Sequence, residues 1–384
     1  MTPQKLTGFH KFVTFVLVAI LIILVLGFAV NGWQTNENLP DSGDVGNKTD
    51  DTDNNDTNEN GNPPNDNNQA PPEDNREPPD PLPPEVEPIV YISPITGLEI
   101  SEERYNTAPT GVVVDPKAPL YGVSDSELSI EFPIEDGSSR LLVYSANEDI
   151  LWKIGALKAT RSFISEMSGF FGGIVVSYGK DDVIVYDAWE TDAFSLDLSL
   201  YSDCYYIENT LYVYTSENMI ELAKTKKPQL QTQSFYKNAP FDFYENASFR
   251  GTGSASTVII PYSDKNETEL YFHEKSGQYL YYKSANRKMD MLTGQNIAYK
   301  NVFVLFADST TYEKAEGSEL VIDVATGGKG YYVSNGTYTE FIWKTDVSGT
   351  LSFFTLSGET LKVNPGNSYI SFYKSSSVSK VTII

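Results

Sequence analysis

Nineteen consecutive residues near the amino terminus, from Phe12 to Val30, carry no charge and only one hydroxyl, that of Thr14. A transmembrane helix rises about 1.5 Å per residue and needs roughly 20 apolar residues to cross a hydrocarbon core. Two lysines and a histidine precede this run, and the first charged residues after it are acidic. Because positive flanks stay in the cytoplasm, we expect residues 1–11 to be cytoplasmic and the rest of the chain to lie outside.

A cleaved secretory signal is the alternative to an uncleaved membrane anchor. Gly27, Phe28 and Ala29 form a small-x-small sequence like those that signal peptidase cuts. The apolar core of a signal usually spans only about 7–15 residues, however, and Trp33 follows where an interfacial aromatic residue would lie. The length therefore favours a single transmembrane helix over residues 12–30. The run ends without the cysteine that a lipid anchor needs.

Residues 34–88 have the composition of a disordered, acidic tether. They contain fifteen acidic residues, two basic residues and eleven prolines, with almost no large apolar side chain. Such a segment cannot bury enough apolar surface to offset the entropy of ordering, and charge repulsion with proline runs extends it. Asp51, Asp53 and Asn55 suggest a weak calcium loop, but Asp56 stands where an EF-hand needs glycine. We expect a spacer between the membrane and a folded part.

The composition of the remaining residues limits the chemistry of the folded part. Cys204 is the only cysteine in the chain, so no internal disulfide can form. His273 is the only histidine beyond the amino-terminal flank, which argues against a His-rich zinc site. We expect no metal, no cofactor and no nucleic-acid partner.

Strands and helices alternate between residues 89 and 246, which predicts an α/β domain. Helical spacing of apolar residues begins at Lys158 and ends at Gly172, and Ser216 is positioned to cap a second helix. Strands are predicted on both sides of the first helix, over residues 111–115, 128–133, 140–145, 174–177 and 183–186.

Residues 250–384 show strand patterns and no helical period. Asn335-Gly336 suits a type I′ hairpin, and further turn residues separate the short apolar runs. This pattern predicts an antiparallel sheet that forms a sandwich or barrel. The overall prediction is an α+β protein, with an N-terminal α/β domain (89–246) and an all-β antiparallel sandwich or barrel-like domain (250–384) on a single transmembrane helix.

Several short motifs of the folded region occur in the order seen in one protein family. They are Ser93–Leu98 (SPITGL), Lys153–Arg161 (KIGALKATR), Asn301–Val304 (NVFV), Thr326–Tyr331 (TGGKGY), Trp343-Lys344 and Asn364–Gly366 (NPG). On these motifs, residues 90 to 375 resemble the YerB-like family of predicted bacterial envelope lipoproteins. The resemblance implies an exported, envelope-associated protein without an established reaction. The chain departs from the family in lacking the lipid-bearing cysteine and in having Lys158 and Ala159 beside Arg161.

Four polar residues form the candidate ligand-binding site. Strand alternation places Glu131 on the face opposite Phe132, where it could face a cleft. Arg140 lies on the next strand, and Lys158 and Arg161 share one face of the predicted helix near its amino end. The site would recognise an anionic or carbohydrate ligand of the cell envelope. A structural network of carboxylates and cations is the alternative interpretation, and ion-pair networks often imitate sites.

The sequence thus favours a binding or interaction module of the bacterial cell envelope, held at the membrane and not acting as an enzyme. An envelope polysaccharide hydrolase is the rival function. It would use a carboxylate pair such as Glu131 and Asp136, one protonated and one ionised.

Overall fold

A computed structural model of the chain describes residues 89–179, 195–208, 211–226, 240–314, 317–346 and 349–384. Residues 83–384 form one compact unit. The transmembrane helix predicted over residues 12–30, the tether over 34–88 and the strand over 183–186 lie outside the described residues. Within the described ranges, no helix combines the length and the apolar character that a membrane crossing requires.

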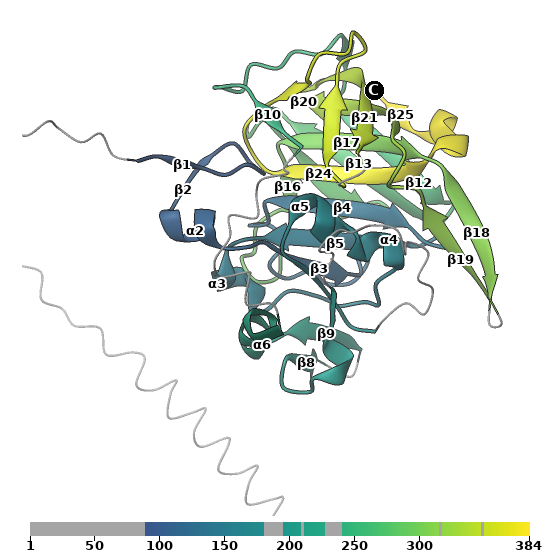
Figure 1. The fold of residues 1–384 in the computed structure, drawn as a ribbon. Coiled ribbons are helices and arrows are strands. Elements are labelled where there is room, and N and C mark those ends of the chain that lie inside the picture. The colour runs from purple at the N-terminus through teal and green to yellow at the C-terminus, as the bar shows by residue number, and fades with distance from the viewer. Residues whose placement is uncertain (1–88, 180–194, 209–210, 227–239, 315–316, 347–348) are drawn as a thin grey trace, which may run out of the picture. The chain divides into compact units, whose positions relative to one another are not determined.

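A large mixed sheet runs through the middle of this unit (Figure 1). Its strands follow the order β11-β21-β20-β17-β24-β4-β5-β3-β6-β7, and β22 pairs with β21. The bounds are β3 (Thr110–Val114), β4 (Leu128–Pro133), β5 (Ser139–Ser145), β6 (Ile174–Ser177), β7 (Ser195–Asp197), β11 (Gly253–Ser254), β17 (Asn301–Ala307), β20 (Gly328–Ser334), β21 (Thr337–Thr345), β22 (Leu351–Phe354) and β24 (Ser368–Lys374).

A second, smaller sheet has the order β15-β14-β13-β12-β25, with β16 paired to β14. Its strands are β12 (Thr257–Ser263), β13 (Asn266–His273), β14 (Gln278–Lys283), β15 (Asn286–Arg287), β16 (Ala298–Tyr299) and β25 (Thr382–Ile383). Four two-stranded pairs complete the strands: β1 (Tyr91–Ile92) with β2 (Glu99–Ile100), β8 (Tyr205–Glu208) with β9 (Tyr212–Thr215), β10 (Asp242–Phe243) with β23 (Lys362–Val363), and β18 (Ser309–Lys314) with β19 (Gly317–Ile322). The last pair extends as a long hairpin (Figure 1).

Helices are short and belong mainly to the first half of the folded unit. They are α2 (Glu102–Asn106), α3 (Glu148–Leu151), α4 (Ser162–Ser165), α5 (Met167–Phe171), α6 (Asn218–Lys226) and the 3-10 turns η1 (Leu198–Leu200) and η4 (Ser375–Lys380). The helical period from Lys158 is confirmed only over α4 and α5, and Gly172 ends α5 with a positive φ of 78°. The second predicted helix is confirmed as α6, which begins two residues after Ser216.

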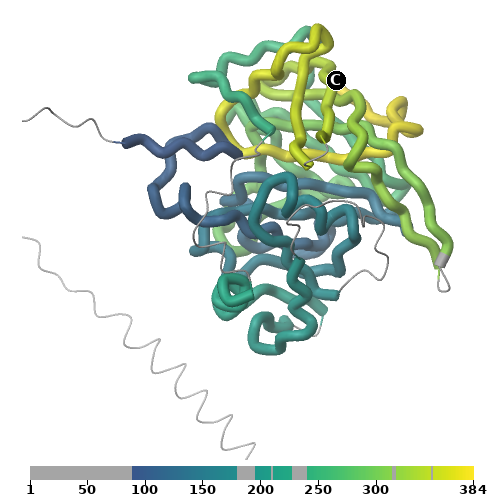
Figure 2. The backbone as a smooth tube through the Cα atoms, in the orientation of Figure 1, coloured from purple at the N-terminus to yellow at the C-terminus, as the bar shows by residue number. Residues whose placement is uncertain are grey.

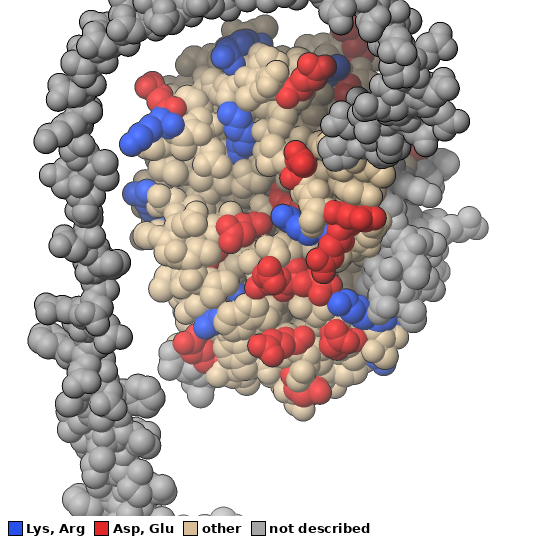
Figure 3. Space-filling model, turned by 90° about the vertical axis from the view of Figure 1, so that its left-hand side faces the viewer, with Lys and Arg blue, Asp and Glu red and all other residues tan. Residues whose placement is uncertain are grey.

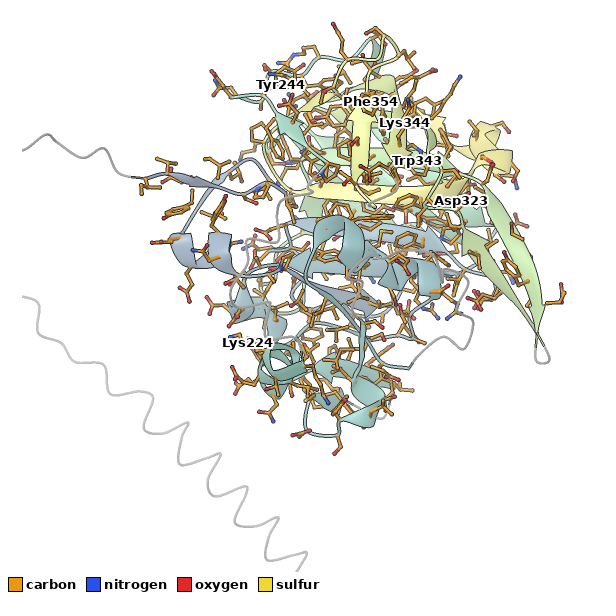
Figure 4. The ribbon with its side chains drawn as sticks, viewed as in Figure 1. Lys224, Tyr244, Asp323, Trp343, Lys344 and Phe354 are labelled. Carbon is orange, nitrogen blue, oxygen red and sulfur yellow. The ribbon has the colours of Figure 1, made fainter. Side chains whose placement is uncertain are left out.

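Both faces of the large sheet are buried. One face packs against the smaller sheet, so that Val304 of β17 and Leu270 of β13 belong to the same apolar core. The opposite face packs against α4 and α5, where Phe163 and Phe170 contact the core that contains Trp343 (Figures 1 and 4). This double coverage explains why β3, β4 and β17 are buried along their whole length, and why β3 and β17 are almost continuous apolar runs.

The two segments predicted as separate domains share the large sheet. β24, near the carboxyl terminus, pairs in parallel with β4 of the first half, and Ser368 aligns with Leu128. Figure 2 shows these two stretches of chain running side by side. The second half is also not purely antiparallel as predicted, because β17 pairs with β24 in parallel over residues 301–307. The unit is mostly β, and both halves build its large sheet. Helices α4 and α5 pack on one face of this sheet, whereas α3 and α6 contribute to the core on the other face.

Candidate functional site

Glu131 lies between the two sheets and not in a cleft. Alternation does place its side chain opposite Phe132, but that face of β4 is covered by β13 and β14, and Glu131 is 0% exposed. An ion pair with Lys283 of β14 neutralises the carboxylate, with 2.5 Å between Nζ and Oε1. Four hydroxyls also donate to it, those of Ser139 (2.6 Å), Thr268 (2.8 Å), Tyr281 (3.1 Å) and Tyr369 (2.7 Å).

These contacts make Glu131 a structural charge. Burial would raise the pKa of Glu131, but Lys283 and the donated hydrogen bonds outweigh that effect and lower the pKa. Burial lowers the pKa of Lys283, and the carboxylate opposes that change. A carboxylate with all its contacts made inside the protein cannot act as an acid or a nucleophile towards a polysaccharide. The hydrolase prediction therefore loses the residue on which it depended.

Arg140, Lys158 and Arg161 are each partly buried, and all three already have polar partners within the protein. Arg161 forms an ion pair with Glu135, and Lys158 Nζ lies 3.4 Å from Asp115 Oδ2. Arg140 donates to the carbonyls of Ala159 and Ser139, and burial together with the nearby Arg161 charge lowers its pKa. The helix that begins here, α4, has only four residues. The three cations share one region, as predicted, but the structure does not bring Glu131 to them.

A different pocket lies where three parallel strands begin. We call it the amino-end pocket, because the residues just before β4, β17 and β24 form its floor. Its volume is about 410 Å³, within the range of small-molecule sites. It is lined by Thr96, Leu98–Ile100, Arg104, Ser124–Glu127, Ser276, Gln278, Lys300 and Pro365–Asn367.

A buried polar network fixes the loop that forms one wall of this pocket. The Tyr332 hydroxyl donates to Asn301 Oδ1 and accepts the Asn364 backbone N–H, each at 2.9 Å. Asn364 Nδ2 donates to Ser334 Oγ at 2.9 Å, and Asn301 Nδ2 donates to the Asn364 carbonyl at 2.8 Å. Satisfied buried networks of this kind hold one conformation, so the wall is preformed.

Gly366 joins this wall to the start of the folded region. Its backbone N–H donates to the Thr96 carbonyl at 2.7 Å. Its φ is +135°, and a Cβ there would lie 2.7 Å from Lys300 Cβ, so glycine is required. Two segments of the motifs quoted above, Ser93–Leu98 and Asn364–Gly366, therefore meet at one pocket, although about 270 residues separate them.

Charges of both signs line the pocket. Arg104 forms an ion pair with Glu127 at 3.0 Å, and the Ala146 backbone N–H donates to the same carboxylate at 3.1 Å. Burial nevertheless raises the pKa of Glu127, against the lowering effect of Arg104. Lys300 Nζ donates to the Gly277 carbonyl and to Asn335 Oδ1, which leaves the third ammonium proton for a ligand.

Asp125 and Gln278 add polar groups with no hydrogen-bond partner among the described residues. The face of the folded unit shown in Figure 3 carries gathered carboxylates and scattered cations. The pocket can thus accept and donate hydrogen bonds and meet a positive or a negative group. Sequence reasoning missed it because its residues come from five separate segments of the chain, and only the Asn-Pro-Gly and Ser-Pro-Ile-Thr-Gly-Leu motifs could have indicated them.

Comparisons with known proteins show that this chain is similar in sequence and in structure to a bacterial protein. Residues 258–370 match the family described as "Protein of unknown function (DUF3048) C-terminal domain". A Bacillus subtilis (strain 168) protein named "Putative lipoprotein YerB" is 25% identical over 290 residues, which cover 72% of this chain and 85% of that protein. The crystal structure of Bacillus subtilis YerB matches with a TM-score of 0.65 at 22% identity, over 77% of this chain and 99% of that one. The predicted resemblance is confirmed.

Proposed function

This chain is a member of the YerB-like family, and on that premise we propose that it is a binding module of the bacterial cell envelope. Its relative bears the name of a lipoprotein, which supports a place at the membrane. In this chain the apolar run over residues 12–30 takes the role of the anchor, with the acidic side outward. The tether over residues 34–88 carries the folded unit away from the bilayer.

The amino-end pocket is the observation that carries the binding function. It has the volume of a small-ligand site and a wall fixed by the Asn364, Tyr332 and Asn301 network. A preformed pocket loses little conformational entropy when a ligand enters, which favours binding. The side chains of Asp125 and Gln278 have no hydrogen-bond partner among the described residues, which favours their contact with a ligand.

The lining residues indicate the chemistry of the ligand. Asp125 suits an ammonium group, Lys300 suits a carboxylate, and Gln278 can pair with an amide. The described residues that line this pocket include no aromatic ring, which argues against sugar stacking here. The short peptide stems of the bacterial wall combine amides, ammonium groups and carboxylates. We therefore favour a wall peptide as the ligand.

Titration of purified muropeptides into the full-length protein tests this function. We expect saturable binding that Asp125→Asn and Gln278→Ala each weaken by about tenfold, since each removes one polar contact. Asp264→Asn, at an exposed position away from the pocket, is the matched control and should bind as the wild type does. Absence of muropeptide binding, or equal weakening by the control, would refute the proposal.

A further inference from the structure

A second pocket lies at the opposite ends of the parallel strands β17 and β24. Its volume is about 510 Å³, and it lies between the end of β17, the start of β20 and the turn η4. We call it the glycine pocket, because Gly327, Gly328 and Gly330 form its floor. We propose that it binds a neutral saccharide of one or two rings. This inference goes beyond the proposed function, since the two pockets share no residue.

The floor is bare backbone, and the packing of the strands requires it to be so. A Cβ at Gly328 would lie 2.2 Å from the Phe306 carbonyl oxygen, and a Cβ at Gly330 would lie 2.6 Å from the Val304 carbonyl oxygen. The preceding turn is held by Asp323, whose Oδ1 accepts the Ala325 backbone N–H at 2.8 Å (Figure 4). Glycine is therefore required where β20 packs closely against β17, and this part of the pocket floor carries no side chain.

Two aromatic rings form one wall. The Phe306 and Tyr331 rings stand perpendicular to each other, with centroids 5.3 Å apart. Phe306 is buried, whereas Tyr331 is only partly buried and lines the pocket. The apolar face of a sugar ring packs well on an aromatic face, and the tyrosine hydroxyl supplies a polar group beside it.

Charged side chains surround the aromatic wall. Asp308 and Glu340 are exposed carboxylates at the pocket, and carboxylates accept hydrogen bonds from neighbouring hydroxyls. Lys329 has no ion-pair partner among the described residues and can donate to a ring or hydroxyl oxygen. Two carboxylates against one ammonium group leave the lining negative, which disfavours polyanionic polymers. This set therefore suits a neutral sugar.

Calorimetric titration of the full-length protein with chitobiose and with maltose, two neutral disaccharides, tests the proposal. We expect at least one of these neutral oligosaccharides to bind, and Tyr331→Ala to weaken that binding by about tenfold or more. Asp308→Asn, an exposed substitution that keeps the side-chain volume, should weaken it by several-fold. The control is Tyr338→Ala, because Tyr338 is a partly buried tyrosine of β21 that touches Tyr331 without lining the pocket.

The outcomes separate this site from a general effect on folding. If Tyr338→Ala and Tyr331→Ala weaken oligosaccharide binding equally, the loss of binding comes from a disturbance of the sheet, and the proposal is overturned. Binding of neither oligosaccharide, or full binding by both Tyr331→Ala and Asp308→Asn, also overturns it. Muropeptide binding at the amino-end pocket should be unchanged in Tyr331→Ala, so failure here leaves the proposed function standing.

Discussion

Lys283 Nζ lies 2.5 Å from Glu131 Oε1, and this ion pair connects β14 of the smaller sheet to β4 of the large one. The two side chains are 1% and 0% exposed. Because water does not reach either group, each charge depends on the other and on the surrounding hydroxyls for its solvation. The pair therefore fixes how the two sheets align, and its energetics can be measured.

A double-mutant cycle should show strong coupling between these residues. Glu131→Gln and Lys283→Met each leave one charge buried without its partner, so each should lower the free energy of unfolding by about 3–5 kcal/mol. The double variant should lose less than the sum of the two, since no lone charge remains. The matched cycle on Lys158 and Asp115, whose side chains are 42% and 26% exposed, should give about 0–1 kcal/mol. Equal coupling in the two cycles would contradict a solvent-free pair.

The Glu131 carboxylate should also make the free energy of unfolding depend on pH. The pKa of Glu131 is lowered from 4.5 in the folded state, so the unfolded chain takes up this proton first as the pH falls. The free energy of unfolding should therefore decrease below about pH 4.5. Denaturant titrations between pH 3 and pH 6 measure this decrease. It should be smaller in Glu131→Gln, while the opposite contribution of Glu127, whose pKa is raised, is common to both proteins.

Tyr332 should matter for both stability and ligand binding. Tyr332→Phe removes the hydroxyl that donates to Asn301 and accepts from the Asn364 backbone, and leaves both groups buried without that partner. We expect a loss of about 1–3 kcal/mol in unfolding free energy and weaker muropeptide binding. Tyr338→Phe is the control, because Tyr338 lies outside this network, and it should change stability by no more than about 0.5 kcal/mol. A Tyr332→Phe protein that matches this control would show that the network does not hold the pocket wall.

The charge step across residues 12–30 predicts that the folded unit lies outside the cell. Protease added to intact cells should cut first in the segment 34–88 and release the folded unit, which blotting against the C-terminal part would detect. In inside-out vesicles the folded unit should survive. The reverse pattern would contradict an outward orientation.

Local patterns predicted much of the fold. Strand patterns placed β4 and β6 with the bounds that the structure has, and Asn335 and Gly336 adopt the positive φ values of 52° and 71° that a type I′ turn needs. Strand pairing was not predictable in this way, because nothing in the period of β24 says that its partner is β4, about 240 residues earlier. The predicted domain boundary at residues 246–250 rested on the change from a mixed helix and strand pattern to a strand pattern, which carries no information about pairing between the two halves.

The candidate site shows the same division between local and non-local information. Alternation gave the correct face for Glu131, but only the chain that covers that face decides between cleft and interface. Lys283, the cation that neutralises Glu131, lies 152 residues further along the sequence. The amino-end pocket was missed because five separate segments contribute its residues, and the arrangement of these segments in space follows from the sheet and not from any one stretch of sequence.

Amide hydrogen exchange, measured with and without muropeptide on the full-length protein, tests the central claim most directly. We predict that the ligand slows exchange in residues 96–104, 124–127 and 365–367, which line the amino-end pocket. Exchange in the β18–β19 hairpin, which contributes no residue to the pocket, should not change. Protection confined to other segments, with these three unaffected at saturating ligand, would contradict the account.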